Sequence, residues 1–162
     1  MRRESHARPS AESMCHNIEN YFTTAIPLNR HLPALEPGTA FFWKAGAEGR
    51  LLISRCGKCR RFQHPPLPLC PHCGGDAPTP SPVSGRGRVA SFTINEQRWT
   101  ADLDVPFVFA AVELEEQAAL YVFTNIVGCA VHEVRIGMPV TVHFEQHGEV
   151  YLPMFEPRCE PR

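Results

Sequence analysis

The feature that most constrains this chain is a pair of Cys-x-x-Cys motifs. Cys56 and Cys59 form the first motif, Cys70 and Cys73 form the second, and ten residues separate them. Two cysteines separated by two residues sit at the ends of a tight turn, so two such turns can place four thiolates around one ion. The spacing therefore predicts a four-cysteine zinc site. A rubredoxin-like iron site and a redox-active dithiol pair are the alternatives.

The predicted zinc would be structural. Four protein sulfurs complete a tetrahedral ion and leave no position for water or substrate. We expect one Zn²⁺ per chain, which would stabilise a segment of about 30 residues that cannot build a hydrophobic core alone. His64 and His72 lie near the cysteines, but we interpret both as surface residues because four thiolates are already present.

Composition favours a small β-rich protein. The chain has 162 residues, too few for a large catalytic fold such as a TIM barrel, and its 16 prolines argue against a helical bundle. Seven cysteines, an odd number, suit reduced thiols and metal ligands better than a disulfide framework. The sequence contains no apolar stretch of about 20 residues and no signal-peptide pattern, so we expect a cytoplasmic protein without a membrane role.

Periodicity and proline content divide the chain into five parts. A proline-rich linker with polyproline character is expected over 77–84, and Thr39 is the candidate N-cap of a helix ending near Glu48. The five parts are a disordered or loosely docked tail (1–31), an extended arm and helix (32–48), a zinc ribbon (49–80), an OB-fold barrel (83–156) and a short tail (157–162).

The last half of the chain alternates apolar and polar residues in short runs separated by turn signals. Five strands in about 70 residues suit a small closed barrel, for which an OB-type barrel is the leading candidate. The predicted fold class is thus mainly β, with a short N-terminal helix, a zinc ribbon and a five-stranded OB-type barrel. The predicted strands cover 89–95, 107–114, 119–127, 140–144 and 150–155.

Charge is distributed unevenly along the chain. Residues 44–88 carry eight basic and two acidic side chains, whereas residues 89–162 carry four basic and eleven acidic ones. Such asymmetry is compatible with an anion-binding surface on the ribbon. The alternative is that the two halves neutralise each other by packing or simply face water.

Several short motifs along residues 32–156 occur in the order found in a known family. They are Leu32-Pro33, Phe42-Trp43, Glu48–Leu51, His64–Pro66, Cys70–Gly74, Ser84–Gly87, Pro106–Val108, Asn125–Gly128, Arg135–Val140 and Leu152–Phe155. With these motifs the chain resembles the rubredoxin-like zinc-ribbon plus OB-fold proteins, formerly a domain of unknown function, that accompany thiolase-like enzymes in acyl-CoA, lipid and steroid metabolism. It departs from them at Leu67, where the family usually has an arginine, and in the tail before Leu32.

The resemblance implies an accessory role. The chain would be a non-catalytic subunit that associates with a lipid-transfer-type thiolase or an aldolase and supports acyl-CoA processing. The residues agree, since the sequence has no serine elbow, phosphate loop or dinucleotide fingerprint. Cys129 ends an apolar run, and we interpret it as an inert buried thiol.

Two other functions compete with this one. The first is a stand-alone acyl-CoA-binding protein, for which Arg86 and Arg88 are the candidates to contact CoA phosphates. The second is a single-stranded nucleic-acid-binding module, since ribbons and OB barrels both bind single strands. The sequence pI of about 6.7 disfavours this second function, because nucleic-acid-binding domains usually exceed about 9.

The predicted partner contact lies on the helix and the ribbon. Phe41, Phe42 and Trp43 offer large aromatic side chains of the kind that anchor protein interfaces. Arg60 and Arg61 would orient the partner by charge. The alternative is that the three aromatic residues belong to the core.

Overall fold

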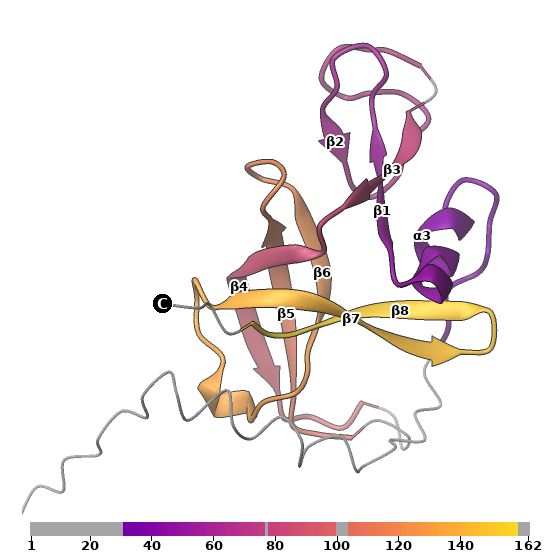
Figure 1. Cartoon of the computed structure of the whole chain (residues 1–162). Coiled ribbons are helices and arrows are strands. Elements are labelled where there is room, and N and C mark those ends of the chain that lie inside the picture. The colour runs from indigo at the N-terminus through magenta and orange to yellow at the C-terminus, as the bar shows by residue number, and fades with distance from the viewer. Residues whose placement is uncertain (1–30, 77, 100–103, 159–162) are drawn as a thin grey trace, which may run out of the picture.

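The computed structural model describes residues 31–76, 78–99 and 104–158, in which a small sheet stands on a barrel (Figure 1). Residues 1–30 of the expected N-terminal tail and 159–162 of the C-terminal one lie outside the described residues. No helix within the described ranges has the length and hydropathy needed to cross a bilayer. The division into five parts stays a prediction.

The upper sheet is the predicted ribbon. Its strands are β1 (Leu51–Arg55), β2 (Phe62–Gln63) and β3 (Thr79–Val83), in the order β2-β1-β3 with antiparallel pairing. The cysteine-bearing turns lie at the end of the ribbon that points away from the barrel (Figure 1).

The proline linker is the one prediction that this sheet overturns. Residues 79–83 form β3, which pairs with β1 along its whole length, from Leu51 opposite Val83 to Arg55 opposite Thr79. Pro80 and Pro82 alternate with residues that have an N–H, and an edge strand needs donors toward its neighbour only at every second residue. Alternate prolines are thus compatible with this edge strand, although the sequence pattern alone predicts a polyproline-type linker.

The five-stranded OB-type barrel is confirmed. The strands follow the closed order β4-β5-β6-β8-β7, in which β7 pairs with β4 and β6 runs parallel to β8. A short 3₁₀ turn, η2 (Val131–Glu133), connects β6 to β7. The strands are β4 (Arg86–Asn95), β5 (Phe107–Leu114), β6 (Tyr121–Ile126), β7 (Pro139–His147) and β8 (Val150–Pro157).

The expected helix is present but mixed in type. It consists of the α-helix α3 (Ala40–Lys44) and the 3₁₀ helix η1 (Ala45–Glu48), and ends at Gly49 in the left-handed conformation. Thr39 occupies the N-cap position without a side-chain capping bond; its hydroxyl instead approaches the carbonyl of Glu36 at 3.5 Å.

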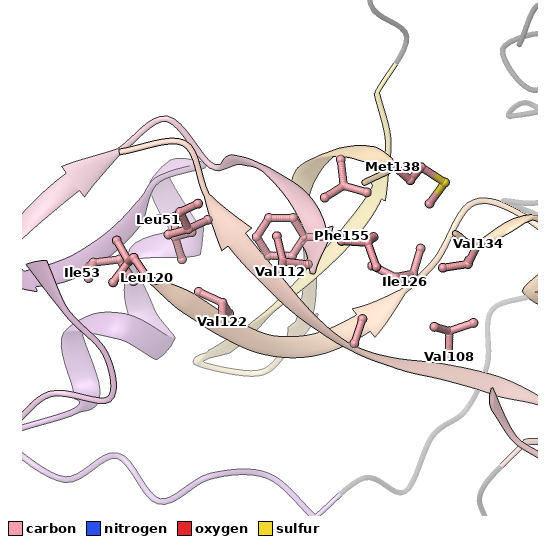
Figure 2. Close-up of a cluster of buried hydrophobic side chains, with 14 of the residues drawn as sticks. Leu51, Ile53, Val108, Val112, Leu120, Val122, Ile126, Val134, Met138 and Phe155 are labelled. Atoms are coloured by element: carbon pink, nitrogen blue, oxygen red, sulfur yellow. The ribbon is translucent and has the colours of Figure 1, made fainter. Parts of the chain in front are cut away.

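A single hydrophobic cluster joins the ribbon to the barrel. Leu51 and Ile53 of β1 lie next to Leu120 and Val122 of the barrel, and Phe155 lies further along the same cluster (Figure 2). Both β1 side chains have less than 2% of their surface exposed. The ribbon therefore shares its inner face with the barrel and has no separate core.

The helical segment packs on the far end of the β7–β8 hairpin. A Cβ built on Gly46 would lie 2.4 Å from Cβ of Tyr151 and 2.6 Å from Cδ1 of Phe144. The close approach of the two elements therefore depends on the absence of a side chain at this position.

We predict that Gly46→Ala lowers the free energy of unfolding by about 1–3 kcal/mol, because the added methyl group must displace β-hairpin atoms. Gly38→Ala is the matched control, since no atom of the described residues lies within 4 Å of a Cβ built there. Urea unfolding of both variants tests this. Equal stability of the two variants would contradict the packing described.

Candidate metal centre and adjoining surfaces

The four predicted cysteines come together at the outer end of the ribbon. The Sγ atoms of Cys56 and Cys73 are 3.7 Å apart, those of Cys59 and Cys70 are 3.6 Å apart, and all four lie within 4.8 Å of one another. Sulfurs bound to a tetrahedral zinc at about 2.3 Å would be separated by about 3.8 Å. The residues present thus fit a zinc ion, and no other group of three metal-binding side chains occurs among the described residues.

The two cysteine turns have the same backbone construction. In the first, the N–H of Arg60 donates to the carbonyl of Cys56 at 3.0 Å; in the second, the N–H of Gly74 donates to the carbonyl of Cys70 at 2.9 Å. Arg60 and Gly74 both have a positive φ, near 65°. The left-handed residue that closes each turn is therefore a glycine in only one of the two.

Backbone groups around the sulfurs favour thiolate. The N–H of Cys59 points at Sγ of Cys56 at 3.5 Å, and this contact, together with the N–H of Lys58 and the neighbouring sulfurs, lowers the pKa of Cys56 to about 6. Burial and the neighbouring sulfurs raise the pKa of Cys59 to about 11, so the four sulfurs do not ionise alike without a cation. Backbone N–H groups of His72 and Cys73 lower the pKa of Cys70. A metal ligand must be deprotonated, so these contacts prepare the site for a cation.

The aromatic helix divides between core and surface. Phe42 is only 3% exposed and lies in the core, which favours the alternative that this side chain is a core residue, while its contact with a partner stays a prediction. Its ring contacts Trp43 edge-on, with the ring centres 4.7 Å apart. Phe41 and Trp43 are half-buried and pack against the core, and their predicted partner contact stays a prediction.

The aromatic side chains with high exposure lie on the barrel. Phe123 of β6 is 65% exposed, and its ring stacks on that of Phe109 of β5 with the centres 6.2 Å apart. Tyr121 is also exposed, one cross-strand position further along β6. Sequence analysis did not single out these residues. Alternation along a strand shows that two faces differ, but it does not show which face of the sheet packs against the core and which faces solvent.

The two arginines proposed for CoA phosphates make bonds within the chain. Nε of Arg86 donates to Glu115 at 2.9 Å, and the same carboxylate accepts a bond from Arg158 at 2.8 Å. Arg88 donates to the carbonyl of Gly137 at 3.1 Å. Their role as phosphate contacts stays a prediction.

His64 is not the surface residue that the sequence suggested. Its ring lies 4.7 Å from that of Phe42, centre to centre, and its Nδ1 is buried without a hydrogen-bond partner among the described residues. Burial lowers the pKa of His64 to about 4, so the ring is neutral at pH 7. His72 is exposed, as expected.

The side chain of Gln117 joins the barrel to the ribbon. Its Oε1 accepts a hydrogen bond from the N–H of Phe62 at 2.9 Å, and its Nε2 donates to the carbonyl of Phe62 at 3.1 Å. A cleft of about 360 Å³ lies beside this contact, lined among others by Arg61, Leu67 and Leu120. Sequence analysis gave no signal for this residue, since its role depends on a segment 55 positions away.

Two family models match the chain in the same order as the ribbon and the barrel of the structure. A ChsH2 rubredoxin-like zinc ribbon domain matches residues 43–79, and a ChsH2 C-terminal OB-fold domain matches residues 81–145. One chain of a solved Ltp2-ChsH2(DUF35) aldolase superposes with a TM-score of 0.70 and 36% identity, covering 78% of this chain and 98% of that one. The chain belongs to the ChsH2 (DUF35) family.

Two curated proteins are similar to this ChsH2-family chain. A probable enoyl-CoA hydratase alpha subunit of Thermomonospora curvata is 38% identical over 129 residues, which are 79% of this chain and 40% of that protein. The benzoylsuccinyl-CoA thiolase subunit BbsA of Thauera aromatica is 33% identical over 96 residues, which are 55% of this chain and 66% of that subunit. The chain therefore spans less than half of the hydratase subunit.

We predict that Cys56→Ser or Cys73→Ser abolishes tight zinc binding and lowers the free energy of unfolding by about 3 kcal/mol or more, because metal binding is coupled to folding. Metal analysis and urea unfolding measure both effects. Cys129→Ser is the control, since Cys129 is half-buried outside the cluster and burial raises its pKa to about 11. Four freely reactive thiols in the folded wild type would contradict the site.

We also predict that His64→Phe removes part of the acid sensitivity. An unfolded histidine has a pKa near 6.5, so the unfolded chain takes up a proton that the folded chain refuses, and stability falls as the pH drops from about 6.5 to about 4. Phenylalanine retains a ring against Phe42 and cannot be protonated.

The stability of His64→Phe relative to wild type should therefore rise by about 2–3 kcal/mol between pH 7 and pH 4. Urea unfolding at several pH values, with zinc content measured in each sample, provides the comparison. Parallel pH curves for the two proteins would show that His64 takes up a proton as readily in the folded chain as in the unfolded one, which would contradict the lowered pKa.

Proposed function

We propose that this chain is a non-catalytic subunit that assembles with a thiolase-superfamily enzyme, of the lipid-transfer thiolase or aldolase type, and supports the processing of an acyl-CoA substrate. The observation that carries the proposal is the match to nearly the whole of one chain of the Ltp2-ChsH2(DUF35) aldolase. The similarity to a benzoylsuccinyl-CoA thiolase subunit supports the same partner class.

The chemistry of the described residues is compatible with an accessory role. Acyl transfer by a cysteine needs a thiolate near a base. Cys129 is the only described cysteine outside the metal centre, and burial together with the charge of Glu133 raises its pKa to about 11. A thiol in this state is a poor nucleophile at neutral pH.

The zinc in this proposal is structural, with one ion per chain held by Cys56, Cys59, Cys70 and Cys73. When bound, it supplies crosslinking of the two turns and no open coordination position. Its function is to hold β1 and β2 in place beside the barrel, so that surfaces on the ribbon and the barrel keep a fixed relation.

Two surfaces are candidates for the partner contact. Phe41 and Trp43 present half-buried rings beside the ribbon, as the sequence suggested, with Arg60 and Arg61 exposed on the first cysteine turn. Phe123 and Phe109 form the second surface, where exposed stacked rings provide the preorganised apolar area of an interface anchor.

We predict that the purified chain has no thiolase, aldolase or acyltransferase activity and that turnover appears only with the partner. The test is co-purification of the full chain from its source cell, identification of the thiolase-type subunit, and assay of each component and of the reconstituted complex with acyl-CoA thioesters. Zinc analysis of the same samples should give about one ion per chain.

Variants of this chain, tested in the same reconstitution experiment, locate the surface that contacts the partner. Phe123→Ala or Trp43→Ala should weaken assembly at least about tenfold at every salt concentration, whereas Arg60→Glu with Arg61→Glu should slow association mainly at low salt. Turnover by the chain alone would overturn the proposal. So would a folded chain that forms no complex with the thiolase-type subunit and instead binds acyl-CoA or single-stranded DNA alone.

A further inference from the structure

The outer end of the ribbon carries cations that form no ion pair with a described acidic side chain. Lys58, Arg60 and Arg61 are exposed, and none of them has an ion pair within the described part of the chain. The other arginines of the ribbon are engaged, since Arg50 pairs with Glu48 and Arg55 bonds to the carbonyl of Arg60.

Exposed aliphatic side chains occur in the same part of the ribbon as these cations. Leu67 is 46% exposed and Leu69 is 57% exposed, both in the segment between the two cysteine motifs. Leu69 precedes Cys70 and Arg60 follows Cys59, and the sulfurs of these cysteines are 3.6 Å apart. Leu67 and Arg61 line the same cleft. We call the set Lys58, Arg60, Arg61, Leu67 and Leu69 the ribbon tip.

The ribbon tip is built on a restrained backbone. Pro65, Pro66 and Pro68 lie beside the leucines in the sequence, and each has its own φ angle fixed by its ring. Gln63 donates from Nε2 to the carbonyl of Leu67 at 2.9 Å. A backbone segment that is restrained before binding loses less entropy on binding, which favours recognition of a partner. The adjoining cleft has room for an inserted side chain.

The metal centre beneath the tip affects its charge. Four thiolates around Zn²⁺ would carry two formal negative charges, and Asp76 adds a third at a β-bridge with Leu69. However, Cys56 and Cys70 are buried while the three cations are exposed, so an approaching molecule meets the cations first. The thiolates also explain why a ribbon of this kind tolerates several cations close together.

We propose that the ribbon tip binds an acidic segment of a partner protein in which an aliphatic or aromatic side chain accompanies Asp or Glu. The carboxylates would pair with Arg60, Arg61 and Lys58, and the apolar side chain would contact Leu67 and Leu69 and enter the cleft. This goes beyond the proposed function, because it names the chemistry recognised by a surface whether or not the partner is a thiolase-type enzyme.

A nucleic acid or a lipid surface would also be attracted by cations. Single strands are held by stacking on aromatic side chains between the basic residues, and the exposed groups here are leucines and prolines. Stable anchoring at a membrane needs a larger apolar face than two leucines provide. A protein segment matches the combination best.

The test is selection of a random-peptide library on the immobilised, zinc-loaded full chain, followed by anisotropy titration of the selected peptides. The expected peptides contain Asp or Glu beside Leu, Ile or Phe. Arg60→Glu with Arg61→Glu, and separately Leu67→Ser with Leu69→Ser, should each weaken binding at least about tenfold. Arg135→Glu and Ile136→Ser, at exposed barrel positions, are the matched controls and should change affinity less than about twofold.

Zinc content and circular dichroism of every variant report whether the ribbon is intact. If the Arg60→Glu, Arg61→Glu variant loses zinc, the proposal is tested by the peptide affinity of the Leu67→Ser, Leu69→Ser variant. The proposal would be overturned if no peptides were selected or if the selected peptides lacked acidic residues. It would also be overturned if variants that keep their zinc and their circular dichroism spectrum bound the peptides as tightly as the wild type. Tighter binding of oligo-dT or of phosphatidylserine vesicles, lost in the same variants, would also overturn it. Because the selection uses this chain alone, its outcome is independent of complex formation with a thiolase-type subunit.

Discussion

The structure depends on the constraint that four sulfurs must meet at one point. The cysteines come from two turns separated by a proline-rich loop, and Sγ distances of 3.6 and 3.7 Å show that the turns face each other closely. The ribbon has no core of its own at this end. The metal centre holds its outer end, while Leu51 and Ile53 hold its inner end in the barrel core.

Two further contacts fix the direction of the ribbon. Gln117 pairs with both backbone groups of Phe62 as a neighbouring strand would, which compensates for the short length of β2. In addition, the ring of Phe42 belongs to the core and contacts His64, with the ring centres 4.7 Å apart. Since these contacts come from the barrel and from α3, a protein bound to the ribbon would also be positioned relative to the barrel.

The metal ligands and most strands could be predicted because their signals are local, such as cysteine spacing, alternation and turn residues. Features that depend on distant segments could not. The prolines of 79–83 read as a linker until β1 is known to lie beside them. The sequence suggests that His64 is a surface residue, because nothing local shows that the ring of Phe42 lies against it. It also leaves open whether Phe42 belongs to the core, where the structure places it.

The same distinction applies to charge. The sequence left open whether the basic ribbon and the acidic barrel neutralise each other. Glu115 is paired with Arg86 and Arg158, so this part of the barrel's acidity is balanced within the barrel itself. Lys58, Arg60 and Arg61 have no such pair among the described residues. Neutralisation between the halves therefore does not account for these three cations, and a carboxylate brought by another molecule would meet exposed cations that are free to form an ion pair with it.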